Sequence, residues 1–259
     1  MSIDPIEMNS RAWDYEAGHG SAWARAVTDG EIGEAREGRL SLRITINKPV
    51  PESWTEGLKG ERVLILGGGG GQQTPLLSAY GALVDTVDIS PEMLRRDREA
   101  LERHHLNAGL HQRAMEDLSI FPDGAFAAVI SPEALNFTED IGKVYSEAWR
   151  VLRPGGVFLL GLANPALYMF DDRLLMKGRM RIRYTLPFSD LRSLSEKELR
   201  KRLRKMDTIE FSHTLQDILG GLTAEGFSIT GFFTDSSGFE PVDSFLQDAY
   251  LAIKASKPR

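Results

Sequence analysis

VLILGGGGG, residues 63–71, is the stretch of this sequence that decides the fold. Four apolar residues form a short strand, and five consecutive glycines follow it. A strand that ends in glycines and enters a helix lets the backbone approach a ligand closely. The free N–H groups of the helix N-terminus then point at that ligand. On a parallel sheet, ligands bind beyond the carboxyl ends of the strands. The stretch therefore predicts a ligand-binding loop at that edge of a sheet.

Strands and helices alternate on the carboxyl side of this stretch. Further strands are expected at 83–88, 110–113, 126–131, 157–162, 227–234 and 249–255. Helices are expected at 74–80 with Thr74 as N-cap, at 91–105 after Ser90, and along the apolar stripe that begins at Ile141 and stops before Pro154-Gly155-Gly156. The alternation predicts an α/β fold: a Rossmann-like three-layer sandwich around a seven-stranded, mostly parallel sheet.

The 259 residues are expected to form a single domain. It divides into an N-terminal extension or lid (1–60), a ligand-binding core (61–165), an insertion after the fifth strand (166–210) and the last part of the sheet (211–259). A capping box at 195–198 opens a basic helix in the insertion, and Gly226 is expected to end the helix before the last two strands. Gly220-Gly221 within that helix indicates close backbone packing, because each glycine there costs about 1 kcal/mol relative to alanine.

Composition excludes several classes of protein. The chain has no cysteine, which excludes disulfides, iron–sulfur clusters, thiolate zinc sites and a cysteine nucleophile, and its five histidines show no metal-ligand spacing. A net charge of −6 argues against a dedicated nucleic-acid binder, so the basic run at 200–205 is expected to be a solvated helix face. The N-terminus lacks a signal-peptide pattern, and the longest apolar stretch, 157–170, is interrupted by Asn164-Pro165. We therefore expect a cytoplasmic protein that makes no membrane contact.

The spacing of the glycines restricts the ligand. A dinucleotide fingerprint needs glycines at i, i+2 and i+5, and every register fails at residues 72–74; the lysine of a P-loop is also absent. What remains is G-x-G-x-G at Gly67, Gly69 and Gly71, which fits a nucleoside with a short tail. Asp88 lies 21 residues after Gly67, at the end of the next strand, where a carboxylate can accept hydrogen bonds from both ribose hydroxyls. The alternatives are a tight turn with a helix-capping Asp88, or Asp85 as the ribose ligand.

Four segments in register resemble the class I methyltransferases that use S-adenosylmethionine (SAM). They are 63–71, 87–94, 114–126 and 150–156, and the resemblance covers roughly residues 60–165 well. Further segments at 69–73, 164–171 and 211–215 resemble one bacterial branch of the methyltransferase type 11-like superfamily. The resemblance implies SAM as the cofactor, with the glycine loop passing its methionine part.

By position, the resemblance also implies which residues contact SAM. Asp88 would hold the ribose, Ile89 would lie against the adenine, Met115 and Glu116 would flank the adenine edge, and Ser131 would face the amino-acid end. Met93 is also expected to bind the cofactor. The chain departs from the family at Ile65, Ala114 and Ala127, where an acid is usual. Ile65 removes a usual anchor for the methionine ammonium, and Gln72 or Gln73 is the candidate replacement.

Methyl transfer requires mainly that the nucleophile is aligned and that water is excluded, and a base is needed only when the acceptor must lose a proton. The candidate catalytic residues are His213, before the helix at 214–225, Glu133, after the fourth strand, and Tyr168, past the fifth strand with Asp171 nearby. His213 is equally well explained as a polar residue at a helix start, and Glu133 as a helix start. Trp13 and Tyr15 can either cover the cofactor as a lid or anchor the extension.

The sequence therefore predicts a SAM-dependent methyltransferase that acts on an unidentified small molecule at O, N or C. Two alternatives are an RNA or protein methyltransferase that docks through the basic insertion, and a non-catalytic SAM-binding module. No motif in the sequence specifies the acceptor or an oligomeric state.

Overall fold

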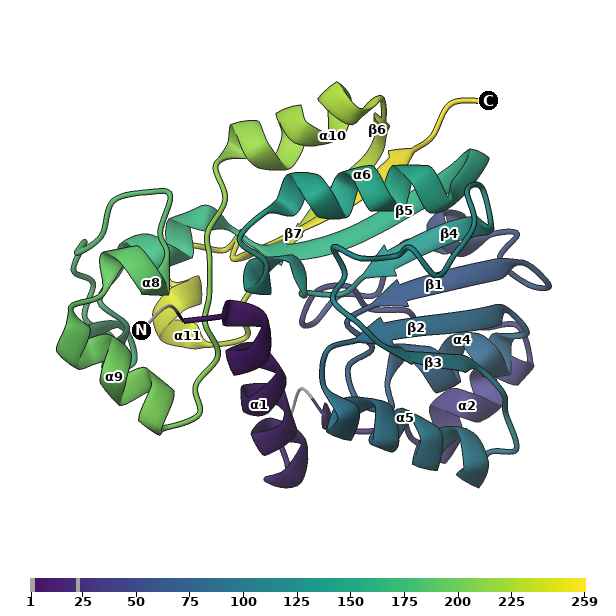
Figure 1. The fold of residues 1–259 in the computed structure, drawn as a ribbon, viewed down its shortest axis with the longest axis horizontal. Helices are drawn as coiled ribbons and strands as arrows, with labels where there is room; N and C mark the ends of the chain where they lie inside the picture. The colour runs from purple at the N-terminus through teal and green to yellow at the C-terminus, as the bar shows by residue number, and fades with distance from the viewer. Residues whose placement is uncertain (1–2, 22–23) are drawn as a thin grey trace.

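The computed structural model describes residues 3–21 and 24–259 and shows a three-layer α/β sandwich (Figure 1). Its sheet has seven strands in the order β3-β2-β1-β4-β5-β7-β6. The first five strands pair in parallel, whereas β7 runs antiparallel to both of its neighbours. The strands are β1 (Arg62–Leu66), β2 (Leu83–Asp88), β3 (Gly109–Gln112), β4 (Phe126–Ser131), β5 (Leu152–Ala163), β6 (Ser228–Asp235) and β7 (Tyr250–Ser256). The predicted fold class is confirmed.

Each face of the sheet buries its own apolar cluster, because successive side chains of a strand point to opposite faces. Leu64 and Leu66 of β1 belong to the cluster beneath α6 (Ile141–Val151) and α10 (Gly221–Glu225). Val63 and Ile65 belong to the cluster on the opposite face, where α4 (Gln73–Tyr80) and α5 (Pro91–Arg103) lie. Both faces are therefore covered, as expected for parallel strands with near-continuous apolar sequences.

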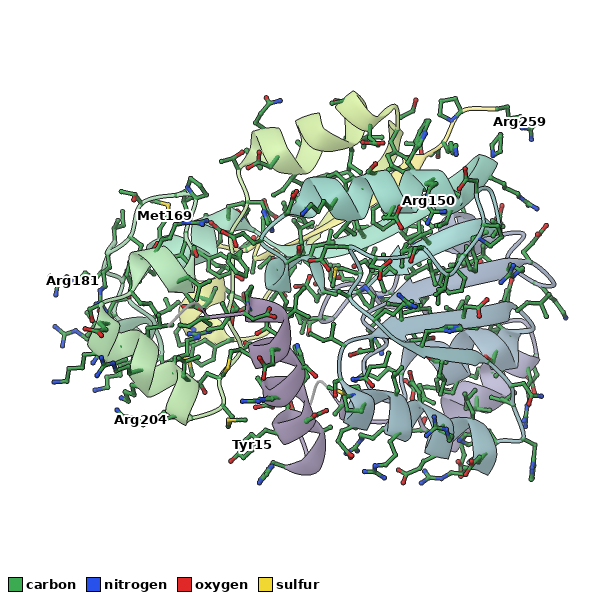
Figure 2. All side chains as sticks on the ribbon, viewed as in Figure 1. Tyr15, Arg150, Met169, Arg181, Arg204 and Arg259 are labelled. Carbon is green, nitrogen blue, oxygen red and sulfur yellow. The ribbon has the colours of Figure 1, made fainter. Side chains whose placement is uncertain are left out.

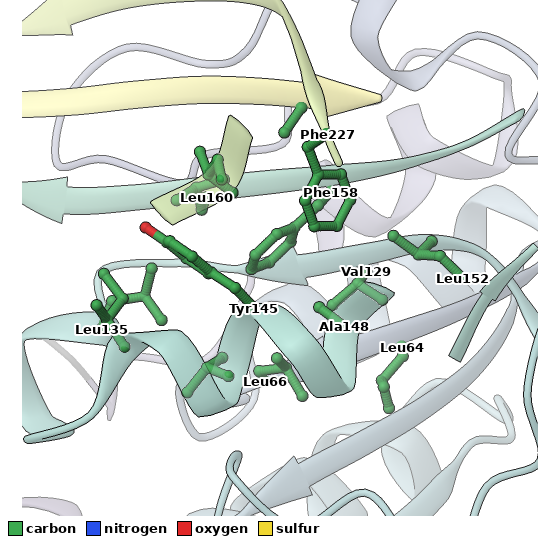
Figure 3. Close-up of a cluster of buried hydrophobic side chains, with 14 of the residues drawn as sticks. Leu64, Leu66, Val129, Leu135, Tyr145, Ala148, Leu152, Phe158, Leu160 and Phe227 are labelled. Carbon is green, nitrogen blue, oxygen red and sulfur yellow. The ribbon is translucent and has the colours of Figure 1, made fainter. Parts of the chain in front are cut away.

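The apolar stripe of α6 packs as its spacing predicts. Ile141, Val144, Tyr145 and Ala148 are buried in one apolar cluster with side chains of β4 and β5. Figure 3 shows Tyr145 and Ala148 beside Val129, Phe158 and Leu160 of these strands. A π-helical turn, η4 (Gln216–Gly220), leads into α10, and a Cβ placed on Gly221 would lie 3.2 Å from Cε2 of Tyr145. Close packing at this glycine pair is thereby confirmed. Gly226 ends α10 in the left-handed conformation, also as predicted.

The N-terminal extension is an integral layer of the fold. Its α1 (Pro5–Gly18) contacts α5, and its α2 (Asp29–Arg36) contacts α4, while α3 (Glu52–Thr55) precedes β1. Leu42 and Ile44 are fully buried in the cluster on the Val63 face. A Cβ placed on Gly161 of β5 would lie 1.7 Å from the carbonyl oxygen of Ile44, so only glycine lets the extension run across this strand.

The insertion gathers beyond the carboxyl ends of the parallel strands, at the left of Figure 1. It contains η3 (Pro165–Met169), α7 (Asp172–Leu175), α8 (Asp190–Ser193) and α9 (Glu196–Arg204), and α11 (Glu240–Asp243) lies beside it. The capping box of Ser195 with Glu198 is confirmed. We name the insertion, residues 166–210, the cap.

The basic run on α9 only partly matches the expected solvated face. Arg204 and Arg181 lie at the outer rim of the cap (Figure 2), and Arg200, Lys201 and Lys205 are exposed. Arg202 is the exception, because its guanidinium turns inward to Asp190 at 2.9 Å and Glu210 at 2.7 Å. The pattern of charges alone does not distinguish this one position, since its two acidic partners come from other segments.

Two predicted boundaries were wrong. Thr74 does not cap α4, which begins at Gln73 after a non-helical Gln72. Thr74 is fully buried, and its hydroxyl bonds to the side chains of Asp97 and Thr86. β5 begins at Leu152 rather than at 157, because Leu152 already pairs with Phe126 across a bulge.

Within the described part of the chain, every helix is too short or too polar to cross a bilayer.

Candidate functional site

A cavity of about 900 Å³ lies between the carboxyl ends of the parallel strands and the cap. Its walls include the loop after β1, the end of β2, the segment after β4 and the end of β5. This is the edge at which the sequence predicts ligand binding, and the volume falls in the range of small-molecule sites. The glycine loop and aromatic residues of the cap line the same cavity.

The glycine loop exposes its backbone to this cavity. Gly67 and Gly69 have φ values of +76° and +72° and both line the wall. A Cβ on Gly67 would lie 2.7 Å from the Cβ of Ala134, and one on Gly69 would lie 2.8 Å from Oε1 of Gln73. Both positions favour glycine by their conformation, and at Gly67 the fixed Cβ of Ala134 also leaves no space for a side chain. Gly71 lies outside the wall, and its N–H points into the protein.

Asp88 lines the cavity at the tip of β2. It is buried, with Oδ2 accepting from the Gly68 N–H at 3.0 Å and Oδ1 accepting from the Ser90 N–H at 2.8 Å. Burial raises the pKa of Asp88 to about 6, so most of the carboxylate is ionised at neutral pH. Asp85, the competing residue, lies mid-strand and pairs with Arg62 at 2.8 Å and His111 at 3.0 Å. Of the two acids, the structure brings only Asp88 to the glycine loop.

A second acid, Asp97 of α5, supports the same loop from below. It is fully buried, and its Oδ1 accepts from the Gly71 N–H at 2.5 Å while Oδ2 accepts from the Thr74 hydroxyl at 2.9 Å. Burial raises the pKa of Asp97 to about 8. Sequence reasoning missed this residue, although a signal exists: position 97 falls on the apolar stripe of α5, between Met93 and Leu101. A carboxylate on a buried helix face needs partners, and here the partners are the loop.

The residues expected at the adenine divide into two groups. Ile89, Met93 and Met115 line the cavity, whereas Glu116 lies outside the wall and accepts a hydrogen bond from the Thr138 hydroxyl.

The two aromatic residues considered as a lid lie in different places. Trp13 lines the cavity and packs edge-on against Phe137, whose ring centroid is 5.1 Å away. Tyr15 is exposed at the far end of α1 and stacks on His19 (Figure 2).

Gln72 and Gln73 both line the cavity beside the glycine loop. The side-chain N–H of Gln73 donates to the carbonyl of Arg43 at 3.3 Å. Its Oε1 is buried and has no hydrogen-bond partner among the described residues. A buried acceptor without a donor is unfavourable by about 1–3 kcal/mol, so this oxygen is suited to receive a donor from a ligand.

Glu133 lies on the segment after β4, in the wall of the cavity. Its φ is +47°, a left-handed conformation that is strained for a residue with a Cβ. Oε2 accepts from the Asn136 side chain at 3.4 Å, whereas Oε1 is buried and unpartnered within the described structure. Burial raises the pKa of this carboxyl well above its ordinary value. Oε1 of Glu133 is thus the second buried acceptor without a partner among the described residues in this cavity, after Oε1 of Gln73.

Tyr168 of η3 lies in the wall beneath the cap. Its hydroxyl donates to Oε2 of Glu210 at 3.0 Å, and its ring stacks on Phe188 with centroids 5.6 Å apart. Burial raises the pKa of Tyr168 well above its ordinary value, so the phenol stays neutral. The ring of Tyr168 can shape the cavity and orient a ligand, whereas its hydroxyl proton already forms a hydrogen bond to Glu210.

Three other residues considered from the sequence lie away from the cavity. His213 is buried outside the wall, 3.0 Å from the carbonyl oxygen of Leu135, and burial lowers its pKa. Ser131 is fully buried within β4, behind the wall. Asp171 pairs with Arg183 at 3.3 Å. Across residues 3–21 and 24–259, no cluster of histidines and acids could hold a metal ion.

A glycine loop and an acid at the tip of the neighbouring strand, open to one cavity, form the arrangement of a nucleoside-binding α/β protein. A family profile described as "Methyltransferase domain" matches residues 64–160. The Bacillus subtilis protein named "Uncharacterized methyltransferase YbaJ" is 37% identical over 252 residues, which cover 97% of this chain and 98% of the Bacillus protein. The chain therefore belongs to the class I SAM-dependent methyltransferases.

Solved structures show the same fold. A SAM-dependent methyltransferase from Mesorhizobium loti superposes with a TM-score of 0.61 and 20% identity, over 79% of this chain and 94% of that protein. The 1,6-didemethyltoxoflavin-N1-methyltransferase of Burkholderia thailandensis, solved with 1,6-didemethyltoxoflavin and S-adenosylhomocysteine, superposes with a TM-score of 0.58 and 14% identity, over 100% of this chain and 92% of that protein.

Proposed function

We propose that this methyltransferase methylates a small molecule that binds between the glycine loop and the cap. The observation that carries the proposal is the continuity of the cavity: one space joins the loop and Asp88 to a pocket walled by cap aromatics. SAM, when bound, supplies the methyl carbon as a substituent of a positively charged sulfur. The cytoplasmic location expected from the sequence stays a prediction.

The residues at the glycine loop suit each part of the cofactor. Asp88 can accept hydrogen bonds from the ribose hydroxyls on the lone pairs that the backbone N–H groups leave open. Ile89, Met93 and Met115 offer apolar surface to the adenine. Oε1 of Gln73, which lacks a donor within the described residues, can accept from the methionine ammonium. Gln73 would then take over the role that Ile65, buried in the sheet, cannot perform.

Glu133 is the best-placed base among the residues that line the cavity. Its orphaned Oε1 can accept the O–H or N–H proton of the acceptor as the new bond to carbon forms. Tyr168 and Phe188 give the acceptor a flat wall, and the cap closes over it, which keeps water from the reacting atoms. His213 lies outside the cavity wall, so it is not placed to act as the base.

Replacing Asp88 by alanine should raise the dissociation constant for SAM and for S-adenosylhomocysteine (SAH) about 10- to 100-fold. The loss of charge-assisted hydrogen bonds to the ribose accounts for about 1–3 kcal/mol. Titration calorimetry with SAH measures the change. Asp85→Ala is the matched control on the same strand and should leave the affinity unchanged. Equal SAH affinity for wild type and Asp88→Ala would refute the ribose assignment.

Replacing Gln73 by leucine should weaken SAH binding about 10- to 100-fold, because a hydrogen bond to a charged group contributes about 1.5–3 kcal/mol. The matched ligand is 5′-methylthioadenosine, which keeps the nucleoside and lacks the amino-acid end. Its affinity should be the same for wild type and Gln73→Leu. An equal loss for both ligands would mean that Gln73 supports the loop rather than the ammonium.

A further inference from the structure

The half of the cavity beneath the cap has its own chemical character. We call it the acceptor half and define it by the wall residues Glu133, Tyr168, Tyr184, Phe188, Asp190, Arg202, Glu210 and Tyr250. Four of these eight residues are aromatic, three carry carboxyl groups and one is a cation. The acceptor half therefore combines flat apolar surface with an excess of acidic groups.

The one cation among these eight wall residues is already neutralised. Arg202 bonds to Asp190 at 2.9 Å and to Glu210 at 2.7 Å, and its Nε also donates to the Thr208 carbonyl at 2.6 Å. An anionic ligand needs a guanidinium or ammonium with donors to spare, because burying a charge without a partner is strongly unfavourable. A carboxylate or phosphate here would meet the Glu133 carboxyl, and the charge of Arg202 is already balanced by Asp190 and Glu210.

One acceptor in the acceptor half has no donor of its own. Oε1 of Glu133 is buried with no partner among the described residues, while the Tyr168 hydroxyl already donates to Glu210. The hydrogen bond from the Asn136 side chain to Oε2 holds the Glu133 carboxyl in the wall. A ligand that presents an N–H or O–H at this point would satisfy the oxygen, and a positive charge on that ligand would strengthen the bond.

The aromatic rings determine the shape of the space. Tyr168 stacks on Phe188 at an interplanar angle of 23°, and Tyr184 meets Phe188 edge-on with ring centroids 4.9 Å apart. Tyr168 and Phe188 both line the cavity, so a flat partner can pack against the ring surface that the stacked pair leaves open, with centroids about 4.5–7 Å apart. A long flexible acyl chain would leave these faces poorly covered.

We propose that the acceptor is a planar aromatic or heteroaromatic molecule, neutral or cationic, that donates an N–H or O–H hydrogen bond to Glu133. Molecules that carry a carboxylate or phosphate at that end are excluded from the acceptor half. This inference rests on the proposed function, because it assigns the acceptor to the part of the cavity that the cofactor leaves open.

Three quinolines of nearly equal size test the inference by binding rather than by turnover. They are 2-aminoquinoline, which offers N–H donors, 2-methylquinoline, which offers none, and quinoline-2-carboxylate, which is anionic. Each is titrated into the 259-residue chain saturated with SAH, with saturation-transfer NMR and calorimetry as readouts. We expect 2-aminoquinoline to bind at least tenfold more tightly than the other two.

Glu133→Leu should abolish the preference for 2-aminoquinoline while leaving SAH affinity unchanged, which also shows that the variant is folded. Glu139→Leu is the matched control on the same connection, because Glu139 is exposed outside the wall and pairs with Arg192. Equal binding of the three probes, tighter binding of the carboxylate, or no binding of any probe would overturn the inference. If wild type failed to bind SAH, the proposed function itself would fall, and the two failures are thus distinguishable.

Discussion

Replacing Glu133 by glutamine should lower kcat about 10²- to 10⁴-fold, which is the contribution of a positioned general base. Glutamine keeps the shape of the side chain and can still accept a hydrogen bond, but it cannot take the acceptor's proton. We therefore expect KM for SAM and SAH affinity to stay near their wild-type values. SAH release with an acceptor fraction from cell extract measures the rate.

The pH dependence of the same enzyme gives an independent check on Glu133. A base acts when it is deprotonated, and burial raises the pKa of Glu133 well above its ordinary value. In wild type, kcat/KM should therefore rise with pH through a titration above the usual range of a glutamate, and Glu133→Gln should lack this limb. Tyr168→Phe is the control, because its phenol is neutral and bonded to Glu210, so the limb should persist. An unchanged kcat in Glu133→Gln would mean that the acceptor loses no proton to this residue.

The sequence predicted best those parts of the fold whose secondary structure is determined by residues close together in the chain. A branched apolar run before five glycines specifies β1 and its loop, and Ser90 before Pro91 starts α5 with its hydroxyl accepting from the Met93 N–H. The stripe of α6 specifies a helix and its buried face at once. At the site, the same local signals brought Gly67, Gly69 and Asp88 to one cavity.

The misses are residues whose role depends on distant partners. The sequence predicts Thr74 as an N-cap, but its hydroxyl instead donates a hydrogen bond to Asp97 on the next helix. The sequence predicts Arg202 as one of several exposed cations, but it forms ion pairs with Asp190 and Glu210 in the cavity wall. Whether Ser131 faces the cavity or the sheet interior depends on the exact end of β4, and a one-residue change reverses the face. A single sequence does not contain these pairings in any periodic form.

Asp97→Asn should flatten the pH dependence of stability between pH 6 and 8. The folded state raises the pKa of Asp97 from an ordinary 3.8 to about 8, so between these values the native protein holds a proton that the unfolded chain has lost. Stability then falls as pH rises, and this loss is complete above the folded pKa. One pKa unit corresponds to about 1.4 kcal/mol, so Asp97 should account for roughly 2–3 kcal/mol of loss over this range.

Urea unfolding at a series of pH values measures this slope, and the difference between wild type and Asp97→Asn isolates Asp97 from Asp88 and Glu133, whose pKa values burial also raises. Asparagine suits the site, because its oxygen can accept from the Gly71 N–H and its amide can donate to the Thr74 hydroxyl. Thr74→Val should have the opposite effect: the Thr74 hydroxyl lowers the pKa of Asp97, so its removal raises that pKa further and steepens the loss. Parallel curves for all three proteins would show that Asp97 does not titrate beneath the glycine loop.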